Sequence, residues 1–567
     1  MMFQKIKLLL FVILFLVIPS IALADYLGQT NLFYIEPSYD KTGRERIPAV
    51  LEKITPQLYF YLDSNWWGGL NFEEQLETRK NLDSLAKEFE EKIYPTLTSV
   101  FGEEEKPGID NDSHITILLH PMPDEAGGYF RGADGYPLAQ ALQSNEREML
   151  YLNSKHLGTL FVKTFLSHEL THLITFSQKE KKYGIEEDVW LNEARAEYAP
   201  TLLGYDDVFE SSNLRRRVKN FLEKPSDSIT EWQGKPTDYG ALNLFIQYLV
   251  DHYGIKILVD SLHSEKVGIA SLNEALKKNG FGEDLAQVFI DWTIAVFVND
   301  CSFGEKYCYK NPNLANFRVA PSVNFLPMVG ESTLSLQDQT KNWAGNWHKF
   351  VGGKGNLKLE FIGSPKVNFQ IPYLLQDAKG NLTLDFLRLD SNQKGEILVL
   401  DFGKKTISLT IIPSLQDKIS KFTSNEPAFT FSWKVSTLAS EETIKLLLAQ
   451  IDFLKAEIAR VQAKITALLA RKMGSTLFSC QQFEKDLYYG MREDAEVRCL
   501  QEFLKNQGPE IYPEGLVTGN FLTLTQTALI RFQEKYAEEI LTPLGLEEGT
   551  GFFGPSTRSK INQLLGY

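Results

Sequence analysis

The sequence predicts a multidomain protein: an α+β domain of two lobes, then an all-β sandwich, a coiled-coil helix and a small all-α bundle. Its 567 residues, with 43% hydrophobic and 23% charged side chains, are globular in composition but too many for one hydrophobic core. The hydrophobic pattern changes along the chain from mixed to helical, then to alternating, and then to an unbroken heptad repeat. The predicted domain boundaries follow these changes.

Residues 1–24 are typical of a secretory signal peptide. Lys5 and Lys7 precede an apolar run over 8–18, and the small residues around Ala24 form a cleavage site. A retained membrane anchor is the alternative, although the run is only about half of the roughly 20 residues that a spanning helix needs. We therefore expect a secreted or extracytoplasmic protein.

Charge and cysteine content restrict the partners and the compartment. The formal net charge of -14 argues against nucleic acid and against an anionic membrane surface. The four cysteines form two close pairs, Cys301 with Cys308 and Cys480 with Cys499, and in an exported chain each pair predicts a disulfide. A zinc site made of all four thiolates is the alternative, but it lacks C-x-x-C spacing.

The first two predicted segments are the lobes of the α+β domain. Residues 25–156 mix strand patterns, such as 115–120, with a helical pattern over 78–100, and so predict an α/β lobe. Residues 157–319 are predominantly helical in pattern. The candidate helices here are 156–176, 189–203, 240–253, 271–279 and 284–298.

Two further changes of pattern follow. Residues 320–436 contain short alternating runs between Gly, Asn, Asp and Pro, which predict a β-sandwich. Residues 440–473 carry apolar heptad positions a and d, which predict a coiled coil. Isoleucine at a with mostly leucine at d favours a parallel homodimer, while a long helix packed on its own domain is the alternative. The seam residues are Ile444, Leu447, Ile451, Leu454, Ile458, Val461, Ile465 and Leu468.

One five-residue pattern carries the chemistry. The segment from His168 to His172 reads H-E-x-x-H and lies among apolar residues at helical spacing. Two histidines four residues apart share one helix face, within reach of one Zn²⁺. Glu169 projects about 100° away, where its carboxylate can act as general base on a water at the metal. The pattern therefore predicts a catalytic zinc site.

A zinc site of this kind needs a third protein ligand. The pattern over 190–199 predicts a helix that brings Glu193 against the His pair, and two imidazoles with one carboxylate leave the fourth position open for water. Glu197 follows one turn later, where we expect it to orient a ligand histidine. An exposed acidic helix face is the alternative for Glu197.

At this point a family resemblance is visible. S-H-E-L-T-H-L at 167–173 and W-L-N-E-A-R-A-E-Y-A at 190–199 resemble the gluzincin metallopeptidases, among them the hyicolysin-like group of secreted bacterial neutral metalloproteases. The resemblance covers about 26–320 and implies a zincin-type bilobal peptidase domain. Ala194 and Arg195 depart from it, because many gluzincins have Gly and a hydrophobic residue after the ligand Glu.

The resemblance also implies an oxyanion donor and a mode of cleavage. Tyr239, which precedes Gly240 and Ala241, resembles the downstream Tyr and Gly-Ala element of the gluzincins, although a packing role for its ring is the alternative. The Gly-x-Met-Glu-Asn element of related aminopeptidases is absent, which favours an endopeptidase. We expect residues 148–153 to be the edge strand on which a peptide adds, rather than an interior strand.

The C-terminal residues 478–567 contain three short motifs: L-Q-x-x-L from Leu500, R-F-Q from Arg531 and F-G-P-x-T from Phe553. These motifs resemble the small helical peptidoglycan-binding domain of bacterial envelope hydrolases, although Leu522 and Thr523 replace the usual Gly-Pro. The resemblance implies association with the cell envelope. A packing or regulatory bundle is the alternative. The sequence thus predicts a secreted zinc endopeptidase, with a peptidoglycan peptide hydrolase or a catalytically idle envelope-binding scaffold as alternatives.

Overall fold

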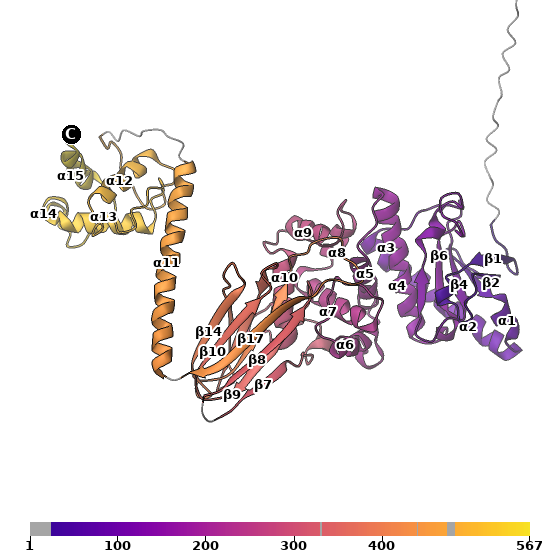
Figure 1. The fold of residues 1–567 in the computed structure, drawn as a ribbon. Helices are drawn as coiled ribbons and strands as arrows, with labels where there is room; N and C mark the ends of the chain where they lie inside the picture. Colours follow the sequence, from indigo (N-terminus) through magenta and orange to yellow (C-terminus); the bar gives the residue numbers. More distant parts are fainter. Residues whose placement is uncertain (1–23, 329–330, 439, 473–481) are drawn as a thin grey trace, which may run out of the picture. The chain divides into compact units, whose positions relative to one another are not determined.

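The computed structural model describes residues 24–328, 331–438, 440–472 and 482–567 (Figure 1). They belong to two compact units that meet after Ser440, and each is treated by itself. Residues 1–23 of the predicted signal peptide lie outside the described part of the chain, as does Cys480. None of the described helices is both long enough and apolar enough to cross a membrane.

The first unit begins with a mixed six-stranded sheet in the order β1-β2-β3-β4-β6-β5. Strands β3, β4 and β6 are parallel to one another, and the remaining neighbours are antiparallel. The strands are β1 Thr30–Tyr34, β2 Arg46–Ile54, β3 Leu58–Asp63, β4 Ile115–His120, β5 Gly128–Phe130 and β6 Met149–Asn153.

One expectation about this sheet is wrong. Residues 148–153, expected at the edge, include β6, which lies between β4 and β5 and is therefore an interior strand. The edge strand next to β6 is β5, whose three residues are too few to show an alternating pattern in the sequence.

Helices cover one face of the sheet. Apolar side chains of α2 (Phe72–Glu88), α3 (Tyr94–Phe101) and α4 (Phe161–Thr175) share a core with alternate residues of the central strands. The opposite face carries a smaller core that includes Tyr129 and Tyr151. This packing fixes α4 against β5 and β6, and α4 is the helix that carries the H-E-x-x-H pattern.

The helical lobe follows α4 in the sequence and extends the same core. Among its helices, α5 packs on both α4 and α7, and α6 packs on α7. The lobe contains α5 Val189–Leu202, α6 Asn213–Glu223, α7 Pro236–Tyr253, α8 Lys256–Leu262, α9 Gly268–Lys278 and α10 Leu285–Val298. Side chains of α4, α5, α6 and α7 can therefore meet at one place.

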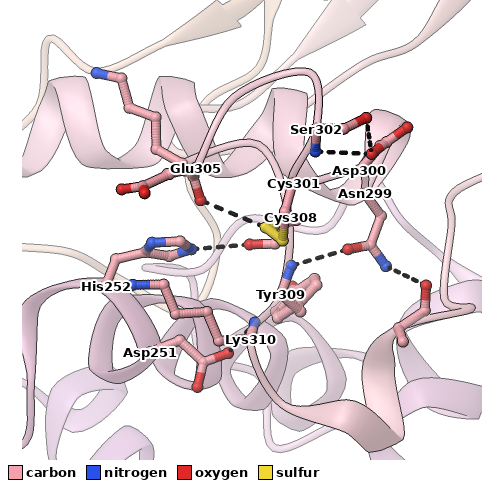
Figure 2. The surroundings of a disulfide bond; sticks show 12 residues. Asp251, His252, Asn299, Asp300, Cys301, Ser302, Glu305, Cys308, Tyr309 and Lys310 are labelled. Carbon is pink, nitrogen blue, oxygen red and sulfur yellow. Dashed lines mark hydrogen bonds between the residues drawn. A yellow bond between two sulfur atoms is a disulfide. The ribbon is translucent and has the colours of Figure 1, made fainter.

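A disulfide closes the end of this lobe. Cys301 and Cys308 are bonded, which confirms the first predicted pair (Figure 2). His252 Nε2 lies 2.8 Å from the carbonyl oxygen of Cys308, so the bonded loop is joined to the end of α7. The second predicted pair includes Cys480, which lies outside the described residues.

The described residues of 322–438 form strands without helices and are called the β domain below. Its large sheet has two parts, with the strand orders β13-β12-β15-β9-β7 and β14-β10-β17-β8. Among the described residues, the pair Phe402 and Thr406 joins β14 to β15 and so connects the two parts. Both parts contribute to one hydrophobic core. The strands are β7 Ser322–Leu326, β8 Thr333–Thr340, β9 His348–Gly352, β10 Gly355–Gly363, β11 Phe369–Gln370, β12 Pro372–Asp377, β13 Leu382–Phe386, β14 Lys394–Phe402, β15 Thr406–Ile411, β16 Ser414–Leu415 and β17 Phe429–Leu438.

The second unit is helical. Helix α11 spans Ser440–Lys472, the range of the predicted heptads. The remaining helices enclose a separate apolar core, to which Leu500, Phe532 and Phe553 of the resemblance motifs contribute. These helices are α12 Ala495–Asn506, α13 Thr523–Lys535, α14 Ala537–Ile540 and α15 Pro555–Leu565.

A buried carboxyl next to β6 makes the stability of the first unit depend on pH. Glu148 is 6% exposed, and burial, with Asp110 and Glu105 nearby, raises its pKa from 4.5 to about 7. Because the folded-state pKa lies above the unfolded one, the contribution of Glu148 to stability is fully present below about pH 4.5. This contribution, about 3 kcal/mol, is lost as the pH rises through about 7.

We therefore expect Glu148→Gln to raise the melting temperature at pH 8 and to leave it unchanged at pH 4.5. The amide keeps an acceptor for the Ile109 N–H, which lies 3.3 Å from Glu148 Oε1, and removes the charge. Thermal melts at the two pH values test this, with the exposed Glu91→Gln as control. Equal melting temperatures of Glu148→Gln and the unmodified protein at pH 8 would contradict the assignment.

Candidate metal centre

Three predicted ligands meet where α4 and α5 pack together. His168 and His172 lie one turn apart on α4, and α5 brings Glu193 against them. His168 Nε2 lies 3.1 Å from His172 Nε2 and 3.4 Å from Glu193 Oε2, and His172 Nε2 lies 3.7 Å from the same oxygen. Within the described residues, this is the one group of three or more His, Cys, Asp or Glu side chains close enough to hold a metal ion.

The donor set fits a zinc ion. A tetrahedral site with bonds of about 2.0 to 2.1 Å places its ligand atoms about 3.3 to 3.4 Å apart, and the three separations bracket that value. Glu193 Oε2 is buried and accepts no hydrogen bond among the described residues, and its polar neighbours are the ring nitrogens of His168 and His172. A buried carboxylate oxygen without a donor is unfavourable unless a cation satisfies it.

A second layer of side chains orients the histidines. His172 Nδ1 lies 3.1 Å from Asn192 Oδ1, and His168 Nδ1 lies 3.5 Å from Glu197 Oε1. Glu197 is 1% exposed, so the exposed-face alternative for it is wrong. These contacts leave the Nε2 atom of each histidine directed at Glu193.

Glu197 is itself held from α6 and α7. Arg217 Nε donates to Glu197 Oε2 at 2.8 Å, and the amides of Asn213 and Asn243 donate to the same oxygen at 3.0 and 3.2 Å. The sequence analysis missed Arg217, Asn213 and Asn243, since no local motif surrounds them. Asn192 did carry a signal, because it directly precedes the ligand Glu193.

The pKa values of two carboxyl groups beside the histidines, Glu193 and Glu197, are lowered. Burial by itself raises the pKa of Glu193, but the rings of His172 and His168 outweigh burial and hold that pKa well below its usual range. Burial likewise opposes ionisation of Glu197, yet Arg217 lowers its pKa to about 2. Two ionised carboxylates therefore lie beside the histidines, an arrangement that favours binding of a metal cation.

Glu169 lies on the side of α4 that faces β5. A Cβ atom built on Gly128 would stand 3.2 Å from Glu169 Cγ, so the edge strand runs directly beside this side chain. Burial raises the pKa of Glu169, although His168 and His172 act in the opposite direction. No hydrogen bond to its carboxylate is found within the described residues, which leaves both oxygens able to act on a substrate.

Two tyrosines, Tyr239 and Tyr39, lie close enough to Glu193 for its charge to raise their pKa values. Tyr239 lies under the Arg217 guanidinium, whose carbon is 4.2 Å from the ring centroid, and burial and Glu193 raise its phenol pKa. Burial, Glu169 and Glu193 raise the phenol pKa of Tyr39 as well. The sequence analysis missed Tyr39, which precedes the motif by about 130 residues. Both phenols remain protonated donors at neutral pH.

The main chain of β5 has one free edge beside the cluster. The Asn153 N–H of β6 donates to Gly127 O at 3.0 Å, and Tyr129 is paired with Tyr151. In an antiparallel ladder, the N–H and C=O groups of successive residues point alternately toward the paired strand and away from it. Those of Gly127 and Tyr129 point toward β6, so those of Gly128 and Phe130 face outward. An extended peptide can pair with them beside Glu169.

Comparisons with known proteins leave the family open. No protein-family model matches the chain, and no curated protein matches it. The pre-peptidase C-terminal domain of a Bacillus anthracis collagenase is 11% identical, with a TM-score of 0.14, over 20% of this chain and 96% of that one. A periplasmic lysozyme inhibitor from Aeromonas hydrophila is 10% identical, with a TM-score of 0.14, over 21% of this chain and 98% of the inhibitor. TM-scores this low carry no argument about fold or function.

Proposed function

We propose that this chain is a secreted, zinc-dependent endopeptidase of the gluzincin type, held at the cell envelope. One observation carries the proposal: His168 Nε2, His172 Nε2 and the buried Glu193 Oε2 stand at tetrahedral spacing to one another, and Glu169 directly follows His168 on the same helix. A zinc ion bound there would lower the pKa of water to about 7 and polarise a substrate carbonyl.

The side chains of the chain supply the remaining steps. Glu169 takes a proton from the attacking water and delivers it to the leaving nitrogen, because a single general base can return what it has accepted. Tyr239 donates a hydrogen bond to the oxygen on which charge develops. Gly128 and Phe130 hold the substrate in an extended form, without the need for a free amino terminus, which favours internal cleavage.

A second candidate is a peptidoglycan peptide hydrolase, which the resemblance of residues 478–567 to a wall-binding domain favours. Zymography on casein and on purified sacculi separates the two. We expect casein cleavage that is lost with a chelator and restored by zinc. Release of wall peptides without casein cleavage would replace the first proposal with the second.

We also propose that the chain is a parallel homodimer through α11. Leu454, at a d position, is 47% exposed, and the other described seam residues are exposed too, so the apolar seam is available to a second copy. Leu454→Lys should give a monomer in light scattering, because it places a charge in the seam. Phe453→Lys, outside the seam, should leave the dimer intact. A monomeric unmodified protein would refute this assembly.

A further inference from the structure

Residues 228–233, in the connection between α6 and α7, are bound on one side by the β domain. Ser228 Oγ donates to the carbonyl oxygen of Asn342 at 2.7 Å, and the Ile229 N–H donates to that of Trp343 at 3.0 Å. Asn342 and Trp343 lie just beyond strand β8, which ends at Thr340. These two hydrogen bonds place the start of the segment against the β domain.

The same segment carries a buried ion pair with the β domain. Glu231 is 3% exposed, and its Oε1 accepts from Lys341 Nζ at 2.6 Å and from the Glu426 N–H at 3.3 Å. Gln233 Nε2 donates to the carbonyl oxygen of Ser424 at 2.9 Å. Removing Lys341 would leave the Glu231 carboxylate buried without its cation, which is strongly unfavourable in the observed position of the segment.

The other side of the segment touches Tyr239. The Trp232 ring meets the Tyr239 ring edge to face, with 4.7 Å between centroids. Asp238, next to Tyr239 in α7, accepts from the Gln233 N–H at 2.7 Å and from the Lys235 N–H at 3.0 Å. The segment therefore fixes both the ring and the first turn of the helix that carries it.

Arg217 completes the enclosure of Tyr239. Its guanidinium covers the face of the Tyr239 ring while its Nε donates to Glu197, whose other oxygen lies beside His168. Tyr239 is thus held between Trp232, whose neighbours Glu231 and Gln233 bond the β domain, and Arg217, which bonds Glu197. A donor to a developing oxyanion works by being fixed in advance, and a displacement of about 1 Å can cost on the order of 100-fold in rate.

We propose that the β domain is a working part of the catalytic unit: through Lys341 and Glu231 it fixes residues 228–233, and these fix the Tyr239 phenol at the metal centre. Lys341 and Glu231 are accordingly positioning residues. This inference rests on the proposed peptidase function, because it assigns Tyr239 the donor role described there.

Lys341→Met tests the inference in the full-length, zinc-loaded protein. With a quenched fluorescent casein peptide, we expect kcat to fall by 10-fold or more, KM to change little and zinc content to stay constant. Lys341→Arg, which keeps the cation, should recover most of the kcat. In the Tyr239→Phe background, Lys341→Met should cause no further loss, since it acts through that phenol. Independent, multiplicative losses in the double variant would overturn the inference.

The control is another ion-paired lysine of the β domain. Lys358 Nζ lies 3.1 Å from Glu360 and 3.0 Å from Glu396 and does not touch residues 228–233. Lys358→Met should leave kcat unchanged, and an equal loss of kcat in this variant would attribute the effect to general destabilisation and overturn the inference.

A second readout separates failure of the inference from failure of the proposed function. 3-Fluorotyrosine placed at position 239 reports the surroundings of the ring by ¹⁹F NMR, whether or not the protein cleaves peptides. We expect Lys341→Met to shift or broaden this signal and Lys358→Met to leave it in place. If Lys341→Met leaves the ¹⁹F signal unchanged, the positioning role is refuted. If Lys341→Met moves the signal but the unmodified protein does not cleave peptides, the positioning role stands and the proposed function is refuted.

Discussion

Replacing Glu169 with Gln is expected to lower peptide hydrolysis by at least about two orders of magnitude while zinc stays bound. The amide keeps the shape of the side chain beside Gly128 and leaves His168, His172 and Glu193 in place. It cannot accept the proton of the attacking water. General acid-base groups contribute typically 10² to 10⁴-fold, about 3 to 5 kcal/mol of barrier. Single-turnover cleavage of a fluorescent peptide, with zinc measured on the same sample, checks this.

Glu180→Gln is a suitable control, since that carboxylate lies outside the ligand group and accepts from the Tyr136 hydroxyl at 2.8 Å. Its turnover should equal that of the unmodified protein. Near-normal turnover of Glu169→Gln with metal bound would show that the zinc is structural or that another group is the base. The peptidase proposal would then be withdrawn.

Removing the third ligand should abolish both metal binding and activity. Glu193→Ala takes away the one carboxylate of the donor set, and we expect bound zinc to fall well below one equivalent after dialysis, with hydrolysis reduced to background. His168→Ala and His172→Ala should behave alike. The physical reason is that a tetrahedral site with three protein ligands seldom retains its ion after losing one of them.

Metal analysis by mass spectrometry gives the zinc content directly. Glu186→Ala is the matched control, because Glu186 is an exposed carboxylate shortly before α5. It should retain a full equivalent of zinc. Full occupancy in Glu193→Ala would mean that another side chain completes the site, and the assignment of Glu193 would fail.

Local periodicity carried most of what the sequence could predict about the site. The spacing of His168 and His172 places both on one helix face regardless of tertiary structure. Glu193 lies on a second helix, so its position as third ligand required only the further assumption that α5 packs on α4. Each part of the chain also has its own hydrophobic period, and the predicted order of domains depends on that change of period.

What the sequence could not predict depends on contacts between distant segments. Arg217 reaches Glu197 from another helix, and Tyr39 comes from a different part of the fold, so neither has a neighbour in sequence that marks it. The error about the edge strand has a similar cause, because β5 is recognisable only through its pairing with β6. The contacts of Lys341 with residues 228–233 likewise join parts of the chain about 110 residues apart.

The outward main-chain groups of Gly128 and Phe130 have a consequence for what this protein would degrade. Hydrogen bonds to a backbone are indifferent to side chains, but they require the partner to lie fully extended with its own amides unpaired. A compact protein offers such a stretch only during local opening, so its rate of cleavage would follow the population of its open forms. Under the proposed function, the conformational stability of a substrate would protect it more than its sequence does.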